Sequence, residues 1–120
     1  MTAEIIGVEA EVLKLRVSGT LTQAELSAAQ KQVGPILRKH NRLGILVVAE
    51  NFAGWERGGA WGDFSFQEQH DARIARMAIV GDEQWRDLVL LFTSQGLRPF
   101  PVEFFPTERL ADARSWLASG

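Results

Sequence analysis

Residues 43–49 read Leu-Gly-Ile-Leu-Val-Val-Ala, a run without a single polar side chain. Strands inside parallel sheets have this composition because helices cover both of their faces. The run is far shorter than the roughly 20 apolar residues that a membrane-spanning helix needs. We therefore expect residues 43–49 to form the central strand of a sheet and to end at Glu50 and Asn51.

Two strands are predicted near the start of the chain. Residues 11–18 alternate apolar and polar side chains, which indicates a half-buried strand that ends at Gly19. A shorter strand is expected at residues 4–7. The two should pair antiparallel, because only a short turn joins them.

A helix is predicted between residue 22 and His40. Thr22 and Glu25 have the spacing of a capping box, in which the threonine hydroxyl and the glutamate satisfy free backbone amides. The apolar residues that follow lie on one helical face: Leu26, Ala29, Val33, Ile36 and Leu37. Proline removes one intrahelical bond and crowds the preceding turn, so we expect a kink or a break at Gly34-Pro35.

Helices and strands alternate in the rest of the chain. We expect a helix at about 60–72, a strand at 77–80, a helix capped by Asp82, a strand at 102–105 and a final helix capped by Thr107. This alternation predicts an α/β fold with a mixed, mostly parallel sheet of four to five strands and crossover helices. A chain of 120 residues has the size of a single domain, 1–120. The predicted core comprises Phe66, Ile74, Ile79, Trp85, Leu88, Phe92, Phe104 and Trp116.

Composition excludes several classes of function. The chain has no cysteine and a net charge of −2, with acids and bases mixed along it. A nucleic-acid binder normally shows a basic face, so we expect no nucleic-acid partner. We also expect no cofactor, no metal site and no membrane span. The absence of cysteine fits a reducing compartment, and we expect a cytoplasmic location.

Four large aromatic residues fall within thirteen positions: Phe52, Trp55, Trp61 and Phe64. They form either a satellite core under a loop or an exposed surface. An exposed surface of this kind would serve as a dimer interface or as a pocket for an apolar ligand, since Trp and Phe are enriched in both.

His70 and Asp63 are the candidates for a polar site. The unperturbed pKa of histidine lies near neutrality, so His70 could act as a base or a ligand. The alternative is a buried histidine bonded to a backbone carbonyl. On one helix, seven residues place Asp63 about 10 Å away along the axis, too far to orient His70 directly. No nucleophile, base and orienting group can be assembled from the sequence, so we predict that the protein is not an enzyme.

A set of residues and short motifs spread over nearly the whole chain is similar to that of a known family: Gly54-Trp55, Trp61, Asp63, Phe66, His70, the run 76–82, Trp85, Phe104-Phe105-Pro106, Ala113 and Trp116-Leu117. With these residues the chain resembles the SpoIIAA-like family, small bacterial domains related to STAS anti-sigma-factor antagonists. The resemblance implies a mixed sheet covered by helices, as in STAS and CRAL-TRIO domains.

Two functions come with this resemblance. STAS antagonists bind an anti-sigma kinase and are switched by phosphorylation of a serine at the start of the helix after the third strand. Residues 50–64 contain no Ser or Thr, so we predict no phospho-switch in this loop, and Ser65 lies just past it. CRAL-TRIO domains bind lipids and other apolar molecules.

These considerations lead to two hypotheses for the function. The first is a non-enzymatic binding or signalling module that forms a homodimer or binds a protein partner. The second is a carrier or sensor of a small apolar, lipid-like ligand.

Overall fold

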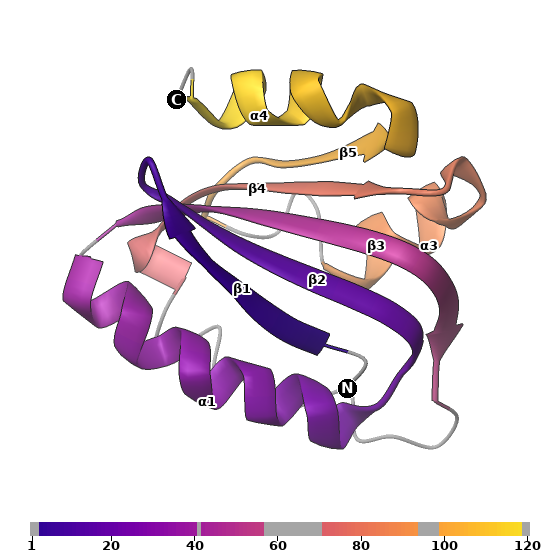
Figure 1. Ribbon diagram of the computed structural model, residues 1–120, viewed down its shortest axis with the longest axis horizontal. Helices are drawn as coiled ribbons and strands as arrows, with labels where there is room; N and C mark the ends of the chain where they lie inside the picture. The colour runs from indigo at the N-terminus through magenta and orange to yellow at the C-terminus, as the bar shows by residue number, and fades with distance from the viewer. Residues whose placement is uncertain (1–2, 41, 57–70, 94–98, 119–120) are drawn as a thin grey trace.

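A computed structural model describes residues 3–40, 42–56, 71–93 and 99–118, and it contains a five-stranded sheet with helices on both faces (Figure 1). The strands are β1 (Ala3–Glu9), β2 (Val12–Leu21), β3 (Leu43–Trp55), β4 (Ile74–Gly81) and β5 (Val102–Pro106). They follow one another across the sheet in chain order. β1 and β2 are antiparallel and all other neighbours are parallel, so the predicted mixed, mostly parallel sheet is confirmed.

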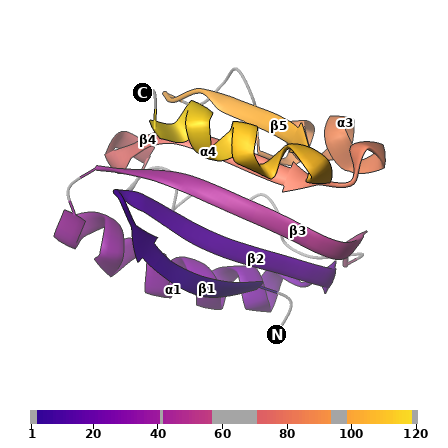
Figure 2. The same cartoon turned by 45° about the horizontal axis from the view of Figure 1, so that its top comes forward.

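The helices are α1 (Gln23–His40), α3 (Arg86–Phe92) and α4 (Leu110–Ala118), with 3-10 turns η1 (Asp71–Arg73), η2 (Glu83–Trp85) and η3 (Thr107–Arg109). α1 and α3 lie on one face of the sheet and α4 lies on the other (Figure 1). Crossovers between parallel strands are right-handed, which puts α1 and α3 on the same face. α4 follows the last strand and does not connect two parallel strands, so this rule does not determine its face. It lies over β4 and β5 (Figure 2).

β3 is the central strand and is buried on both sides, as predicted. Ile45 packs in the core below α1 and α3, whereas Leu46 and Val48 pack in the core below α4. This alternation follows from the period of two along a strand. The predicted two-sided burial therefore reflects two separate apolar cores.

β2 and β3 both extend beyond the predicted ends at Gly19 and at Glu50-Asn51. Their pairing continues to Leu21 and Trp55, with register shifts on either side of Gly19. Bulges of this kind insert an unpaired residue without ending the strand. Asn51 adopts a positive φ of 51°, which asparagine tolerates better than most residues.

α1 is one continuous helix, so of the predicted kink or break at Gly34-Pro35 the break is wrong. The Glu25 amide donates to the Thr22 hydroxyl oxygen at 3.1 Å, which confirms the predicted start. Pro35 lies on the exposed side of the helix. A helix can tilt its carbonyls outward on that side, which makes room for the proline ring.

The predicted helix at 60–72 lies largely outside the described residues. Within the described part, Ala72 belongs to η1, and Ile74 is the first residue of β4. Ile74 pairs with Leu43 and is buried. The predicted place of Ile74 in the core is therefore confirmed, and the strand begins three residues before the predicted start at residue 77.

The predicted core is confirmed in part. Ile74, Ile79 and Phe104 are buried, and Trp85 and Trp116 are partly buried against the two cores. Leu88 and Phe92 are 50% and 37% exposed, so their assignment to the core is wrong. α3 is a single short helix and buries one side chain, that of Val89. Phe66 lies outside the described residues.

The two last helices begin differently. Asp82 is the N-cap of η2, as predicted, and accepts a hydrogen bond from the Gln84 amide at 3.0 Å. Thr107 does not cap the final helix. The cap position belongs to Pro106, which has no side-chain acceptor, so the turn begins one residue earlier than predicted.

Candidate functional site

A bulge near the end of β3 places Phe52 and Trp55 on the same face of the sheet. The register pairs Phe52 with Gly19 and Trp55 with Leu21, leaving Ala53 as an extra residue. In a regular strand, residues three apart would point to opposite faces. The extra residue, Ala53, shifts Trp55 by one position along the strand, so both rings point to the face that α1 and α3 cover.

Phe52 and Trp55 meet two aromatic residues from the region of α3, and we call these four residues the aromatic cluster: Phe52, Trp55, Trp85 and Phe92. The Phe52 ring is 5.1 Å from Trp55 and 5.2 Å from Trp85, both edge to face. Trp55 lies 6.2 Å from Trp85 and 5.0 Å from Phe92. These separations are those of favourable aromatic pairs.

Gly54 lies beside the Trp85 ring, and its backbone conformation requires glycine. Its φ is +103°, a conformation that residues with a Cβ rarely adopt. A Cβ at this position would stand 3.4 Å from the Trp85 ring. A side chain at Gly54 would therefore be strained by the backbone conformation, while its Cβ would make an ordinary contact with the Trp85 ring.

The indole nitrogen of Trp55 is buried and has no hydrogen-bond acceptor among the residues that the structure describes. Buried Trp N–H groups usually find a partner. An unsatisfied buried donor costs about 1–3 kcal/mol. The cluster thus contains a polar group that the described part of the fold does not use.

The aromatic cluster reaches the surface along α3. Leu91 is 76% exposed and Leu88 50% exposed, and Phe92 belongs both to this side of α3 and to the cluster. We call Leu88, Leu91 and Phe92 the apolar side of α3. It is unusual because the exposed side of a surface helix normally carries polar residues.

The structure brings together part of the predicted aromatic group. Phe52 and Trp55 are in contact, whereas Trp61 and Phe64 lie outside the described residues, as do His70 and Asp63. The sequence analysis assigned Trp85 and Phe92 to the core and did not group them with Phe52 and Trp55. Their spacing of seven residues was the available signal, because it puts both on one helical face.

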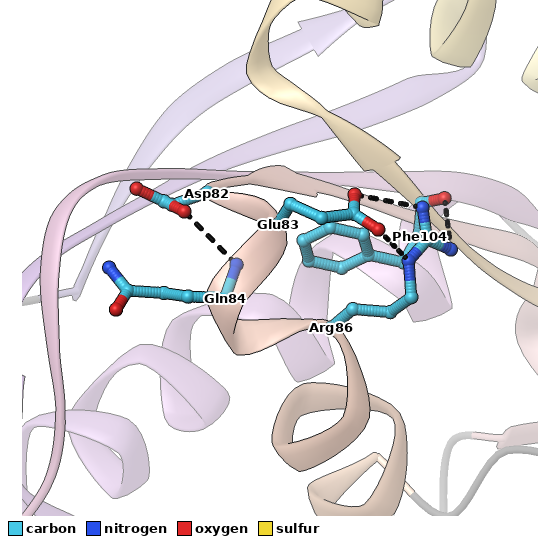
Figure 3. A network of polar contacts seen from close by, with 5 residues as sticks. All are labelled: Asp82, Glu83, Gln84, Arg86 and Phe104. Atoms are coloured by element: carbon cyan, nitrogen blue, oxygen red, sulfur yellow. Dashed lines mark hydrogen bonds and ion pairs between the residues drawn. The ribbon is translucent and has the colours of Figure 1, made fainter.

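A second candidate region lies at the carboxyl ends of β4 and β5. It is a depression of about 570 Å³ lined by Gly81, Asp82, Glu83, Pro106, Thr107 and Glu108. Asp82 is engaged by the Gln84 amide, and Glu83 accepts two hydrogen bonds from Arg86, at 2.7 and 3.0 Å (Figure 3). The hydrogen bond from Arg86 lowers the pKa of the Glu83 carboxyl.

Within this depression, Glu83 is poorly suited to acid–base chemistry. A general acid or base works best with a pKa near the working pH, and Arg86 moves that of Glu83 further away. Arg86 also lies 5.0 Å over the Phe104 ring, so the pair anchors η2 to β5. Over the described ranges, no group of three His, Asp or Glu side chains is placed to hold a metal ion.

The described helices include none that is long and apolar enough to cross a bilayer. The described regions offer an aromatic and apolar surface and a depression lined by acidic residues.

The five-stranded sheet with helices on both faces is that of a STAS-like α/β domain. The sequence profile of the SpoIIAA-like family matches residues 12–118, and the chain belongs to this family. Among solved structures, it is similar to an uncharacterized protein of the DUF3478 family from Shewanella loihica PV-4, which has a SpoIIAA-like fold. Identity is 22%, the match covers 96% of this chain and 93% of the other, and the TM-score is 0.63. This likeness supports the fold alone. No curated protein gives a significant match.

Proposed function

We propose that this SpoIIAA-like domain is a non-enzymatic binding module of the cytoplasm that associates with a second copy of itself through the apolar side of α3 and the aromatic cluster. The observation that carries the proposal is the 76% exposure of Leu91 beside a partly exposed Phe92. A contiguous apolar surface on a monomer commonly marks an interaction site.

The composition of this surface favours a protein interface. Trp and Phe are enriched in interfaces, and a few such residues supply most of the binding energy.

α3 has seven residues and is only about 10 Å long at 1.5 Å per residue. A stable interface buries roughly 800 Å² on each partner, so it must extend from α3 onto neighbouring surface. Family membership agrees with a binding role, because STAS antagonists act by binding another protein.

Sedimentation velocity over a range of protein concentrations tests this proposal. The wild-type chain should show a mass that rises toward two copies, and Leu91→Asp should remain a single copy. Ala111→Asp is the matched control, because Ala111 is an exposed residue of α4 on the opposite face of the sheet. A single-copy mass at every concentration, or association of Leu91→Asp equal to wild type, would contradict self-association. Loss of association in Ala111→Asp would place the interface elsewhere.

A second candidate function is binding of a small apolar ligand at the aromatic cluster. The position of Phe52 and Trp55 favours it, because ligands of open α/β sheets bind beyond the carboxyl ends of parallel strands. Binding sites for small molecules are also lined mainly by apolar and aromatic side chains with few polar groups. Native mass spectrometry of the purified chain should then show a copurified molecule that Phe52→Ala loses. A ligand-free mass combined with self-association would favour the first function.

A further inference from the structure

The indole nitrogen of Trp55 is buried, and its N–H has no hydrogen-bond acceptor among the described residues. It is the one polar group in the rings of the aromatic cluster of which this is true. Phe52, Trp85 and Phe92 surround this indole ring at centroid distances of 5.0 to 6.2 Å. Their ring atoms provide no strong hydrogen-bond acceptor. A phenylalanine at position 55 would fill most of the same space without burying an unused donor.

Orphaned buried donors are rare in folded proteins, and each requires an explanation. We propose that the Trp55 N–H is the hydrogen-bond donor to a bound ligand, and that the site takes molecules with an apolar body and one uncharged oxygen acceptor, such as a ketone or an ester. This inference rests on the ligand-binding function given above as the second candidate.

The single donor decides against a charged ligand. An ionised carboxylate has about four acceptor positions on its two oxygens, and one N–H would leave most of them unsatisfied among aromatic rings. Burial of a charge without such compensation is very unfavourable. A carbonyl oxygen, by contrast, gains its hydrogen bond while the rest of the molecule contacts the rings.

In the proposed complex the ligand enters beside Phe92. Phe92 is the most exposed ring of the aromatic cluster and lies 5.0 Å from Trp55, at an interplanar angle of 36°. A ligand that replaces this ring contact with its own apolar body would bring its carbonyl oxygen to the indole edge. Rotamer changes at partly exposed positions are fast, and rotation of the Phe92 side chain is the movement that this exchange requires.

The test compares butyrophenone with butylbenzene, which share a carbon skeleton and differ by one carbonyl oxygen. Affinities are measured by titration of the ¹⁵N-labelled full chain, with the indole resonances assigned through single Trp→Phe variants. We expect butyrophenone to bind about tenfold more tightly, as one net hydrogen bond allows, and to move the Trp55 indole proton downfield.

Trp55→Phe should bind both molecules with equal affinity and should melt at the same or a higher temperature than wild type, because it removes an unsatisfied donor. Trp85→Phe is the matched control within the aromatic cluster. It leaves the Trp55 N–H in place and should keep the preference for butyrophenone, even if both affinities fall.

The possible failures are distinguishable. Equal affinities of the wild-type chain for the two molecules would overturn this inference and leave ligand binding intact. Failure of both molecules to bind would overturn ligand binding as well. A Trp55 indole proton that is shifted strongly upfield and does not respond to butyrophenone would show that the N–H faces an aromatic ring, and the inference would be wrong.

Discussion

Helices α3 and α4 have equivalent places in the chain, since each follows a parallel strand after one 3-10 turn. They differ in what they bury. α4 places Ala113 and Leu117 in the core on its face of the sheet and exposes polar residues such as Asp112 and Arg114. α3 buries Val89 and exposes Leu88, Leu91 and Phe92.

The ends of the two helices show the same difference. Arg76 in β4 lies 4.8 Å over the Trp116 ring and donates to the Trp116 carbonyl oxygen at 2.8 Å, which fixes the last turn of α4 to the sheet. α3 ends at Thr93, whose hydroxyl donates back to the Val89 carbonyl oxygen within the helix. α4 therefore directs its apolar side chains into the fold, whereas α3 leaves Leu88 and Leu91 at least half exposed. This contrast is why we assign the binding surface to α3.

The largest expected effect is on the α4 side. Leu117→Ala should lower the free energy of unfolding by about 2–5 kcal/mol, because it removes a buried side chain and leaves a cavity. Leu91→Ala on α3 should change it by less than about 0.5 kcal/mol. Urea unfolding at low protein concentration measures both. Similar losses for the two variants would show that α3 is packed as tightly as α4.

The next effect tests how tightly the α3 face is packed where β4 ends. A Cβ at Gly81 would stand 3.1 Å from the Ala49 Cβ, which belongs to the neighbouring strand and cannot rotate away. Gly81→Ala should therefore destabilise the protein by about 1–3 kcal/mol, as other overpacked sites do. A melting temperature equal to that of wild type would mean that β3 and β4 can separate there at little cost.

A smaller effect distinguishes how the two helices begin. Asp82→Ala removes the N-cap before α3 and should cost about 1 kcal/mol. Thr107→Ala should cost less than about 0.5 kcal/mol, because the Thr107 side chain does not cap η3. Denaturant midpoints of the two variants provide the comparison. The reverse order of effects would mean that Thr107 caps the final helix after all.

The smallest effect concerns pH. Arg86 lowers the pKa of the Glu83 carboxyl from its ordinary value of 4.5, so the folded state favours the ionised form. The resulting stabilisation is complete above pH 4.5 and is lost as the pH falls below it through the pKa of the folded state. Glu83→Gln should accordingly lose less stability than wild type upon acidification. Salt should reduce the difference, since both side chains are exposed. Parallel stability curves of the two proteins would exclude a contribution from this pair.

Much of the fold follows from local sequence patterns. The run at 43–49 identified the central strand because a two-sided apolar strand has few alternatives. Thr22 and Asp82 marked the starts of a helix and a 3-10 turn because capping depends on a few adjacent residues. Strand ends were predicted less well. The bulges at Asn51 and Ala53 depend on pairing with β2, a segment about 30 residues earlier in the chain.

The sequence by itself determined that this is a mixed α/β domain whose central strand is buried on both faces, and that Phe52 and Trp55 lie close to the end of that strand. Only the tertiary structure decided that Trp85 and Phe92 join them and that Leu88 and Leu91 face solvent. An apolar stripe on a helix indicates that the stripe is buried, but it does not show whether the stripe packs on the sheet or on another molecule. That depends on how the short α3 lies against β4 and β5, which local propensity does not encode.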